Sequence, residues 1–144
     1  MVVLGAPRKL AIDGLEFARL VGSSGHGVWG TRASLVPQKA AAWNAVVVAK
    51  GPGSMIGAPD GRVWIERGGG PELATGGTGD VLTGITATLV AQRAEPEMVA
   101  AGVHLHALGG ALAAKRSHAR SVTAVDVASA VPGALRSLDS RAGR

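Results

Sequence analysis

The stretch from Leu73 to Gly84, Leu-Ala-Thr-Gly-Gly-Thr-Gly-Asp-Val-Leu-Thr-Gly, constrains this chain more than any other segment. Three glycines and two threonines occupy positions 75–79, and Asp80 follows directly before a run that is typical of a helix. A backbone free of bulky side chains can close around an anion, and a helix that starts there points unpaired N–H groups and its positive dipole end at that anion. The segment therefore predicts a phosphate site with Asp80 at its mouth, where a carboxylate would handle a proton or a metal.

Two better-known phosphate motifs do not explain this segment. A P-loop requires Gly-Lys followed by Ser or Thr, and the chain has no Gly-Lys pair. Leu82 stands where a Rossmann fingerprint has its third glycine. Residues 25–30 match that fingerprint formally, but they follow a predicted helix rather than a strand, so we do not assign a dinucleotide loop to them. The remaining alternative for positions 76–79 is a plain tight turn, followed by an acid that caps the helix.

A second glycine-rich loop, Lys50-Gly51-Pro52-Gly53-Ser54, follows a continuous apolar run at residues 45–49. Such a run is typical of a strand that is covered on both faces. Ligands of open α/β sheets gather at the carboxyl ends of the strands, where Lys50 can neutralise phosphate and the glycines allow the backbone to come close. A plain exit from the strand is the alternative. Because the first loop is also present, we favour a nucleotide site.

The apolar pattern predicts strands and helices in an α/β order. We expect strands at 2–4 and 45–49 and a hairpin formed by 55–58 and 62–65. The expected helices span residues 13–21, 31–44, 80–93, 95–115 and 123–138, and residues 22–30 are expected to form a loop. The spacing from Thr123 to Asp126 predicts a capping box at the start of the last helix. Two core strands and a hairpin are few for the helices that follow, so we expect residues 1–144 to be a single, truncated part of a larger nucleotide-binding domain.

Composition narrows the class of function. The chain has 144 residues, of which 47% are apolar and 17% charged, so a globular fold is expected. The formal charge of +5 is scattered along the sequence, and one Phe, three Trp and no Tyr offer few platforms on which bases could stack. We therefore expect a nucleotide-binding enzyme, with no nucleic acid as partner.

The residue types also exclude several kinds of site. The chain has no cysteine, so disulfides, thiolate zinc sites and cysteine nucleophiles are excluded. His104 and His106 are two residues apart and point to different faces of a helix, so they cannot share a metal, and we expect no metal site built from protein side chains. No apolar run approaches the length of a membrane span. We expect a cytoplasmic protein without a membrane partner that forms a homo-oligomer.

At this point the residues resemble a family. Ala74 to Gly84 resembles the nucleotide-site motif of the ADP/ATP-dependent NAD(P)H-hydrate dehydratases, which belong to the ribokinase-like superfamily. Further stretches agree in the same order: residues 14–20, 47–54, Leu105-His106 with Gly110 and Leu112, 123–127, and Val131-Pro132. The resemblance covers nearly all of residues 14–138 and corresponds to the C-terminal half of the family's domain. It implies a ribokinase-like three-layer α/β/α fold that is incomplete here, with few strands, a hairpin and several helices.

The resemblance implies repair of damaged nicotinamide cofactors by an ADP-dependent hydro-lyase. The substrate is the hydrated form of NADH or NADPH. ADP (or ATP) phosphorylates its hydroxyl group, and elimination of phosphate restores NAD(P)H and, with ADP, leaves AMP. By this resemblance, Asp80 is the catalytic base that contacts the substrate hydroxyl. Gly77, Thr78 and Gly79 form an anion hole, and Gly79 also contacts the AMP moiety. The nucleotide is lined by Lys50, Gly51, Pro52, Gly53 and Ser54. A Mg²⁺ ion on the phosphates, held mainly by phosphate and water, is implied as well.

The chain departs from the family pattern at three places. Asp13-Gly14 stands where the family often has His-Pro, Ser54 where Thr is usual, and residues 69–72 differ from the usual Gly-Asn-Pro-Gly. Two other functions stay open beside the lyase. One is a different ribokinase-like kinase of a small molecule, which would leave a stable phosphate ester. The other is a catalytically impaired nucleotide-binding fragment.

Overall fold

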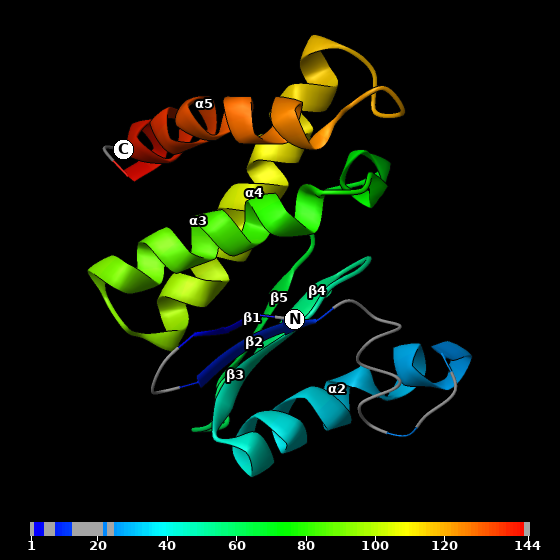
Figure 1. Cartoon of the computed structure of the whole chain (residues 1–144), viewed down its shortest axis with the longest axis vertical. Helices are drawn as coiled ribbons and strands as arrows, with labels where there is room; N and C mark the ends of the chain where they lie inside the picture. The colour runs from blue at the N-terminus through cyan, green and yellow to red at the C-terminus, as the bar shows by residue number, and fades with distance from the viewer. Residues whose placement is uncertain (1, 5–7, 13–21, 23–24, 143–144) are drawn as a thin grey trace. The chain divides into compact units, whose positions relative to one another are not determined.

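The computed structural model describes residues 2–4, 8–12, 22 and 25–142. Its elements are β1 (Val2–Leu4), β2 (Arg8–Ile12), α2 (Gly25–Trp43), β3 (Ala45–Ala49), β4 (Ser54–Gly57), β5 (Val63–Glu66), the 3₁₀ turn η1 (Pro71–Ala74), α3 (Thr78–Gln92), α4 (Pro96–Arg116) and α5 (Ala124–Ala142) (Figure 1). They fall into two compact units, Met1–Arg67 with Ala94–Ala100, and Gly68–Arg93 with Ala101–Arg144, and each unit is described by itself. The single-domain organisation stays a prediction.

The first unit contains a five-stranded sheet with the strand order β1-β2-β3-β4-β5. Strands β2 and β3 run parallel, with Leu10 opposite Val47, and the other pairs are antiparallel. The predicted strands at 2–4 and 45–49 and the predicted hairpin are confirmed, and every residue of β3 is buried. Sequence reasoning missed β2. Its first residues, Arg8 and Lys9, follow Pro7, so the segment lacks the unbroken apolar run by which β3 was found.

Helix α2 packs on β3 and β4 and forms the core of the first unit. Val36 and Ala40 of the helix are fully buried against a cluster completed by Val47, Ala49 and Met55. Residues 25–30 belong to α2, so the prediction of a loop over 22–30 is wrong for them. The predicted helix over 13–21 lies outside the described residues. Each glycine costs a helix about 1 kcal/mol relative to alanine. Tertiary packing of the later turns outweighs that cost, because packing rather than propensity supplies most helix stability in proteins.

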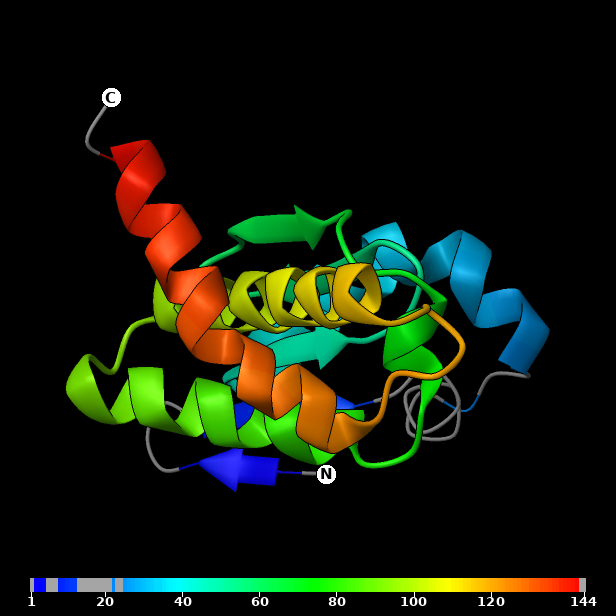
Figure 2. The ribbon, with the colours of Figure 1, turned by 90° about the horizontal axis from the view of Figure 1, so that it is seen from above.

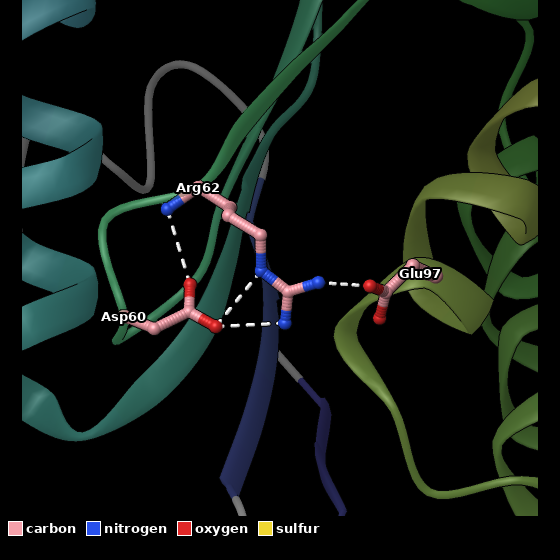
Figure 3. A network of polar contacts seen from close by, with 3 residues as sticks. All are labelled: Asp60, Arg62 and Glu97. Carbon is pink, nitrogen blue, oxygen red and sulfur yellow. Dashed lines mark hydrogen bonds and ion pairs between the residues drawn. The ribbon is translucent and has the colours of Figure 1, made fainter.

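The tip of the β4–β5 hairpin is tied to the start of α4 by ion pairs within the first unit (Figure 3). Asp60 Oδ1 accepts the Arg62 N–H at 3.1 Å, and Asp60 Oδ2 accepts from Arg62 Nε at 2.8 Å. The same guanidinium pairs with Glu97 in the first turn of α4. These hydrogen bonds from Arg62 hold the pKa of Asp60 below its usual value. Because all three side chains are exposed, the network fixes the geometry of the turn more than it stabilises the fold.

The second unit contains η1, α3, most of α4, and α5. A buried cluster of Ala113, Val122, Val127 and Ala130 holds it together, with Leu73 and Val81 packed against it. Helices α3 and α5 are in contact (Figure 2). The predicted capping box at the start of α5 is confirmed, since Asp126 Oδ2 accepts the Thr123 N–H at 2.9 Å and the Asp126 N–H donates to Thr123 Oγ1 at 3.3 Å. The helix runs to Ala142, four residues beyond its predicted end.

Candidate active site

The glycine-threonine loop ends in a left-handed residue that starts α3. Gly77 is the N-cap, with φ 87° and ψ −15°, and a methyl group placed on it would lie 3.1 Å from the Ala124 side chain. Both the backbone angle and the narrow space favour glycine here. As a result Thr78, Gly79 and Asp80 form the first turn of α3, two residues earlier than the helix was predicted to begin.

The two threonines hold the loop from inside. Thr75 Oγ1 donates to the Val122 carbonyl at 3.0 Å, which joins the loop to the start of α5. Thr78 is buried, and its Oγ1 lies 2.8 Å from both the Leu73 and the Thr75 carbonyl oxygens. A hydroxyl group has one hydrogen, so it donates to one of these acceptors at a time. The Thr78 side chain is thus committed to the loop itself rather than to a ligand.

The backbone amides of the loop differ in how they are engaged. The Thr78 N–H donates to Thr75 O at 3.3 Å, and the Asp80 N–H donates to Gly77 O at 3.0 Å. The Gly77 and Gly79 N–H groups make no hydrogen bond within the described part of the chain. Two of the three predicted anion-hole amides therefore remain available as donors at a helix N-terminus, where the dipole favours negative charge.

The surroundings of these amides are open. A methyl group placed on Gly76 would meet no heavy atom of the described residues within 4 Å, and the φ of Gly76 is not positive. The fold of the described chain therefore does not itself require glycine at this position. Asp80 is exposed on the first turn of α3. The exposed Asp80 carboxylate thus lies on the same helical turn as the unengaged Gly79 amide. It can accept a proton from a group that reacts with an anion bound at these amides.

Sequence reasoning missed the role of His106. Its ring is buried on α4, and Nε2 lies 2.8 Å from the Thr78 carbonyl oxygen. Because a carbonyl only accepts, the hydrogen of this bond belongs to Nε2. Gly102, His106 and Gly110 come at intervals of four residues and lie on one face of α4. This spacing of a histidine between two glycines is the sequence signal that would have pointed to a close helix contact.

The two glycines of this face let other elements of the second unit come close to α4. A methyl group on Gly102 would lie 2.7 Å from Thr86 Oγ1 of α3, and one on Gly110 would lie 2.6 Å from Leu73 Cδ2 of η1. Helix α4 thus holds η1 and α3, the two elements that flank the loop. His106 sits between these contacts and reaches the first residue of α3.

The predicted nucleotide loop lies in the first unit, between β3 and β4. Gly51 and Gly53 have φ angles of 143° and 64°, which favour glycine. Ser54 Oγ closes the loop, since it accepts the Gly51 N–H at 3.2 Å and donates to Gly51 O at 3.1 Å. The Lys50 side chain is partly exposed at the end of β3. The loop therefore has a fixed shape and offers a cation at the carboxyl end of a strand.

Arg32 of α2 was not among the predicted site residues, yet it contacts this loop. Its Nη2 donates to the Pro52 carbonyl at 2.9 Å. Burial lowers the pKa of Arg32, but a guanidinium remains charged at neutral pH. The contact joins residues 20 positions apart, which is why a reading of local motifs did not find it.

Within the described ranges, no group of three or more His, Cys, Asp or Glu side chains gathers at a point that could hold a metal ion. No helix in the described residues is long and apolar enough to cross a membrane.

Comparison with solved structures gives the class of the fold. A ribokinase-like superfamily protein from Enterococcus faecalis matches with a TM-score of 0.73 and 26% identity over 90% of this chain and 44% of that chain. The ADP/ATP-dependent NAD(P)H-hydrate dehydratase from Bacillus subtilis, co-crystallised with ATP and Mg²⁺, matches with a TM-score of 0.80 and 31% identity over 89% of this chain and 47% of that chain. The fold is therefore a ribokinase-like α/β fold, as predicted.

Comparison of sequences gives the family. The sequence model of the NAD(P)H-hydrate dehydratases matches residues 13–133, and the chain belongs to this family. The bifunctional NAD(P)H-hydrate repair enzyme of Moorella thermoacetica is 39% identical over 86% of this chain and 24% of its own length. The ADP-dependent (S)-NAD(P)H-hydrate dehydratase of Xanthomonas campestris is 35% identical over 92% of this chain and 46% of its own length. The chain thus spans less than half the length of these two relatives.

Proposed function

We propose that this chain carries the phosphoryl-transfer part of an ADP-dependent NAD(P)H-hydrate dehydratase. The observation that carries the proposal is the start of α3, where the Gly77 and Gly79 amides are unengaged within the described residues and the exposed Asp80 lies on the same turn. The names of the relatives from Xanthomonas campestris and Bacillus subtilis support the same activity.

The proposed reaction has two steps. The Asp80 carboxylate takes the proton of the C6 hydroxyl of hydrated NADH or NADPH while the hydroxyl oxygen attacks the terminal phosphorus of ADP. The bond from that phosphorus to the bridging oxygen breaks, and AMP leaves. The phosphate then departs from C6 with its bonding electron pair, and a proton is lost from C5, which restores the double bond of NAD(P)H. The products are NAD(P)H, AMP and phosphate.

The residues of the two loops have separate roles in this proposal. The unengaged amides of Gly77 and Gly79 hold the charge that develops on the transferring phosphoryl group, because donors fixed in advance need no reorganisation during the reaction. The Thr78 N–H, the third predicted donor of the anion hole, donates to the Thr75 carbonyl instead. Gly79 also contacts the AMP moiety, and Lys50, Gly51, Pro52, Gly53 and Ser54 line the nucleotide. Mg²⁺ bound through phosphate oxygens and water would neutralise part of the phosphate charge.

The proposal extends to the setting of the enzyme. ADP is the expected phosphoryl donor and ATP the alternative, and either NADH hydrate or NADPH hydrate is a substrate. We propose a homo-oligomer that acts in the cytoplasm.

The test is turnover by the purified chain. Hydrated NADH, ADP and Mg²⁺ are mixed with the protein, and the absorbance of reduced nicotinamide is followed together with the formation of AMP. The lyase restores this absorbance, whereas a kinase would form AMP and a stable phosphate ester. Nucleotide binding without either product identifies a binding fragment.

The matched variant is Asp80→Asn, which keeps the size of the side chain but cannot accept the proton. We expect turnover to fall by about 10²–10⁴-fold, the usual contribution of a general base. Nucleotide affinity should stay within about tenfold, or ~1.4 kcal/mol, of the parent. Equal losses of binding and turnover would contradict the role of Asp80 as the base.

A further inference from the structure

The contact between His106 and Thr78 involves the same peptide group that carries the Gly79 amide. The Thr78 carbonyl and the Gly79 N–H belong to one planar unit, in which the C=O and N–H bonds point in opposite directions. His106 Nε2 donates to the carbonyl side of this unit at 2.8 Å. The Gly79 N–H on the other side makes no hydrogen bond within the described residues. The histidine and a ligand of Gly79 would thus occupy opposite edges of the same peptide.

The hydrogen bond from His106 has two physical effects on this peptide. It fixes the plane, so that the Gly79 N–H is directed away from α4. It also polarises the peptide, since hydrogen bonds in a chain strengthen one another by roughly 10–30%. Both effects favour Gly79 as a donor to an anion.

Packing alone does not account for a histidine at this position. The Thr78 carbonyl lies in the first turn of α3, where it already accepts the N–H of the residue four positions later. The bond from His106 is therefore additional and not required to satisfy the carbonyl. Burying an imidazole costs free energy that an apolar side chain of similar volume would not. The neighbouring positions on this face of α4, Gly102 and Gly110, achieve close packing without a side chain.

We propose that His106 is a positioning residue that holds the Thr78–Gly79 peptide with the Gly79 N–H aimed at the transferring phosphoryl group. The expected effect of His106 on turnover depends on the proposed function. Its effect on anion binding by Gly79 does not depend on that function, because any phosphate-like anion at the start of α3 meets the same amide.

The experiment compares His106→Met with His106→Gln. Both side chains have similar lengths, but only Gln carries an N–H donor near the position of Nε2. We expect kcat to fall about tenfold or more in H106M, since small misplacements of catalytic groups have effects of this size. KM for the nucleotide should change less than about threefold, because the other contacts remain. H106Q should recover most of kcat. His118→Gln replaces an exposed histidine of the same unit and should leave both constants unchanged.

A second readout does not need turnover. Inorganic phosphate is titrated into the protein while the amide resonances of Gly77 and Gly79 are followed by NMR. In the parent and in H106Q we expect both resonances to shift. In H106M the shift of Gly79 should be lost or reversed, while that of Gly77 persists. An unchanged Gly79 response in H106M overturns the proposal, as does a kcat equal to that of the parent.

The unmutated protein provides a test that does not depend on the folding of a variant. The ring nitrogen resonances of His106 should show a hydrogen on Nε2, and a ring with the hydrogen on Nδ1 alone overturns the proposal. If the parent binds phosphate through Gly79 but turns over no hydrate, the proposed function fails while the positioning role of His106 stands.

Discussion

Gly76 and Gly77 are neighbours in the same loop, and we expect alanine to affect different properties at the two positions. At Gly77 it should lower the stability of the fold, and at Gly76 it should lower turnover. At Gly77, alanine would adopt a left-handed backbone at a cost of about 1–2 kcal/mol. Its methyl group would also lie 3.1 Å from the Ala124 side chain, an overpacking that costs about 1–3 kcal/mol. Together these effects predict a loss of about 2–5 kcal/mol in the free energy of unfolding for Gly77→Ala.

At Gly76 neither cost applies. Its φ is not positive, and no heavy atom of the described residues lies within 4 Å of the added methyl group. The free energy of unfolding of the Gly76→Ala variant should therefore lie within about 0.5 kcal/mol of that of the parent, as for most surface substitutions. If a phosphoryl group approaches this backbone, the methyl group would displace it. We then expect kcat/KM to fall by about 10–100-fold, the scale of a displacement near 1 Å.

Urea denaturation followed by circular dichroism measures the first quantity, with the m-value compared to show that the denatured states are alike. Steady-state turnover with ADP and hydrated NADH measures the second. Gly84 offers a matched control, because it is an exposed glycine within α3 whose added methyl group also meets nothing. Gly84→Ala should leave turnover unchanged and stabilise the protein by up to about 1 kcal/mol. The reasoning is refuted if G77A is as stable as the parent, or if G76A turns over normally.

Three further predictions concern other parts of the molecule. Lys50→Ala should weaken ADP binding about tenfold while the KM of the hydrate changes less, and an unchanged ADP affinity in calorimetry would remove Lys50 from the site. Arg32→Met keeps the aliphatic stem but not the bond to the Pro52 carbonyl, so ADP affinity should fall about three- to tenfold, and equal affinity would show that the loop holds its shape without Arg32. The hydrogen bonds from Thr123 lower the pKa of Asp126 below its usual 3.8, so the carboxylate stabilises α5 above about pH 4. This stabilisation is lost as pH falls through the lowered pKa. The melting temperature of Asp126→Asn should therefore lie below that of the parent at pH 7 and converge with it in acid, and a constant difference would contradict this.

Much of the fold followed from local patterns. The apolar run of β3 and the alternation and turn of the hairpin predicted their strands, and the Thr123-to-Asp126 spacing predicted the start of α5. These signals are strong because each lies within a few consecutive residues. β2 was missed because Arg8 and Lys9 follow Pro7 and the segment lacks an unbroken apolar run, although it pairs with β1 directly before it as well as with the more distant β3. The start of α2 was misplaced because glycines argue against a helix unless packing elsewhere holds it.

The same distinction between local patterns and long-range contacts applies to the candidate site. The glycine-threonine loop and Asp80 stand out in the sequence because the motif is contiguous. The left-handed conformation of Gly77, which starts α3 two residues early, is a property of the backbone that a glycine permits but does not dictate. His106 and Arg32 reach the two loops from 28 and 20 residues away, and no local pattern records such contacts.

The hydroxyl groups of Thr75 and Thr78 fix the loop through hydrogen bonds within their own unit. If a nucleotide binds there as proposed, these bonds hold the loop in shape, so little ordering entropy should oppose binding. Association should then proceed at a rate set by diffusion and charge rather than by a slow rearrangement of this segment.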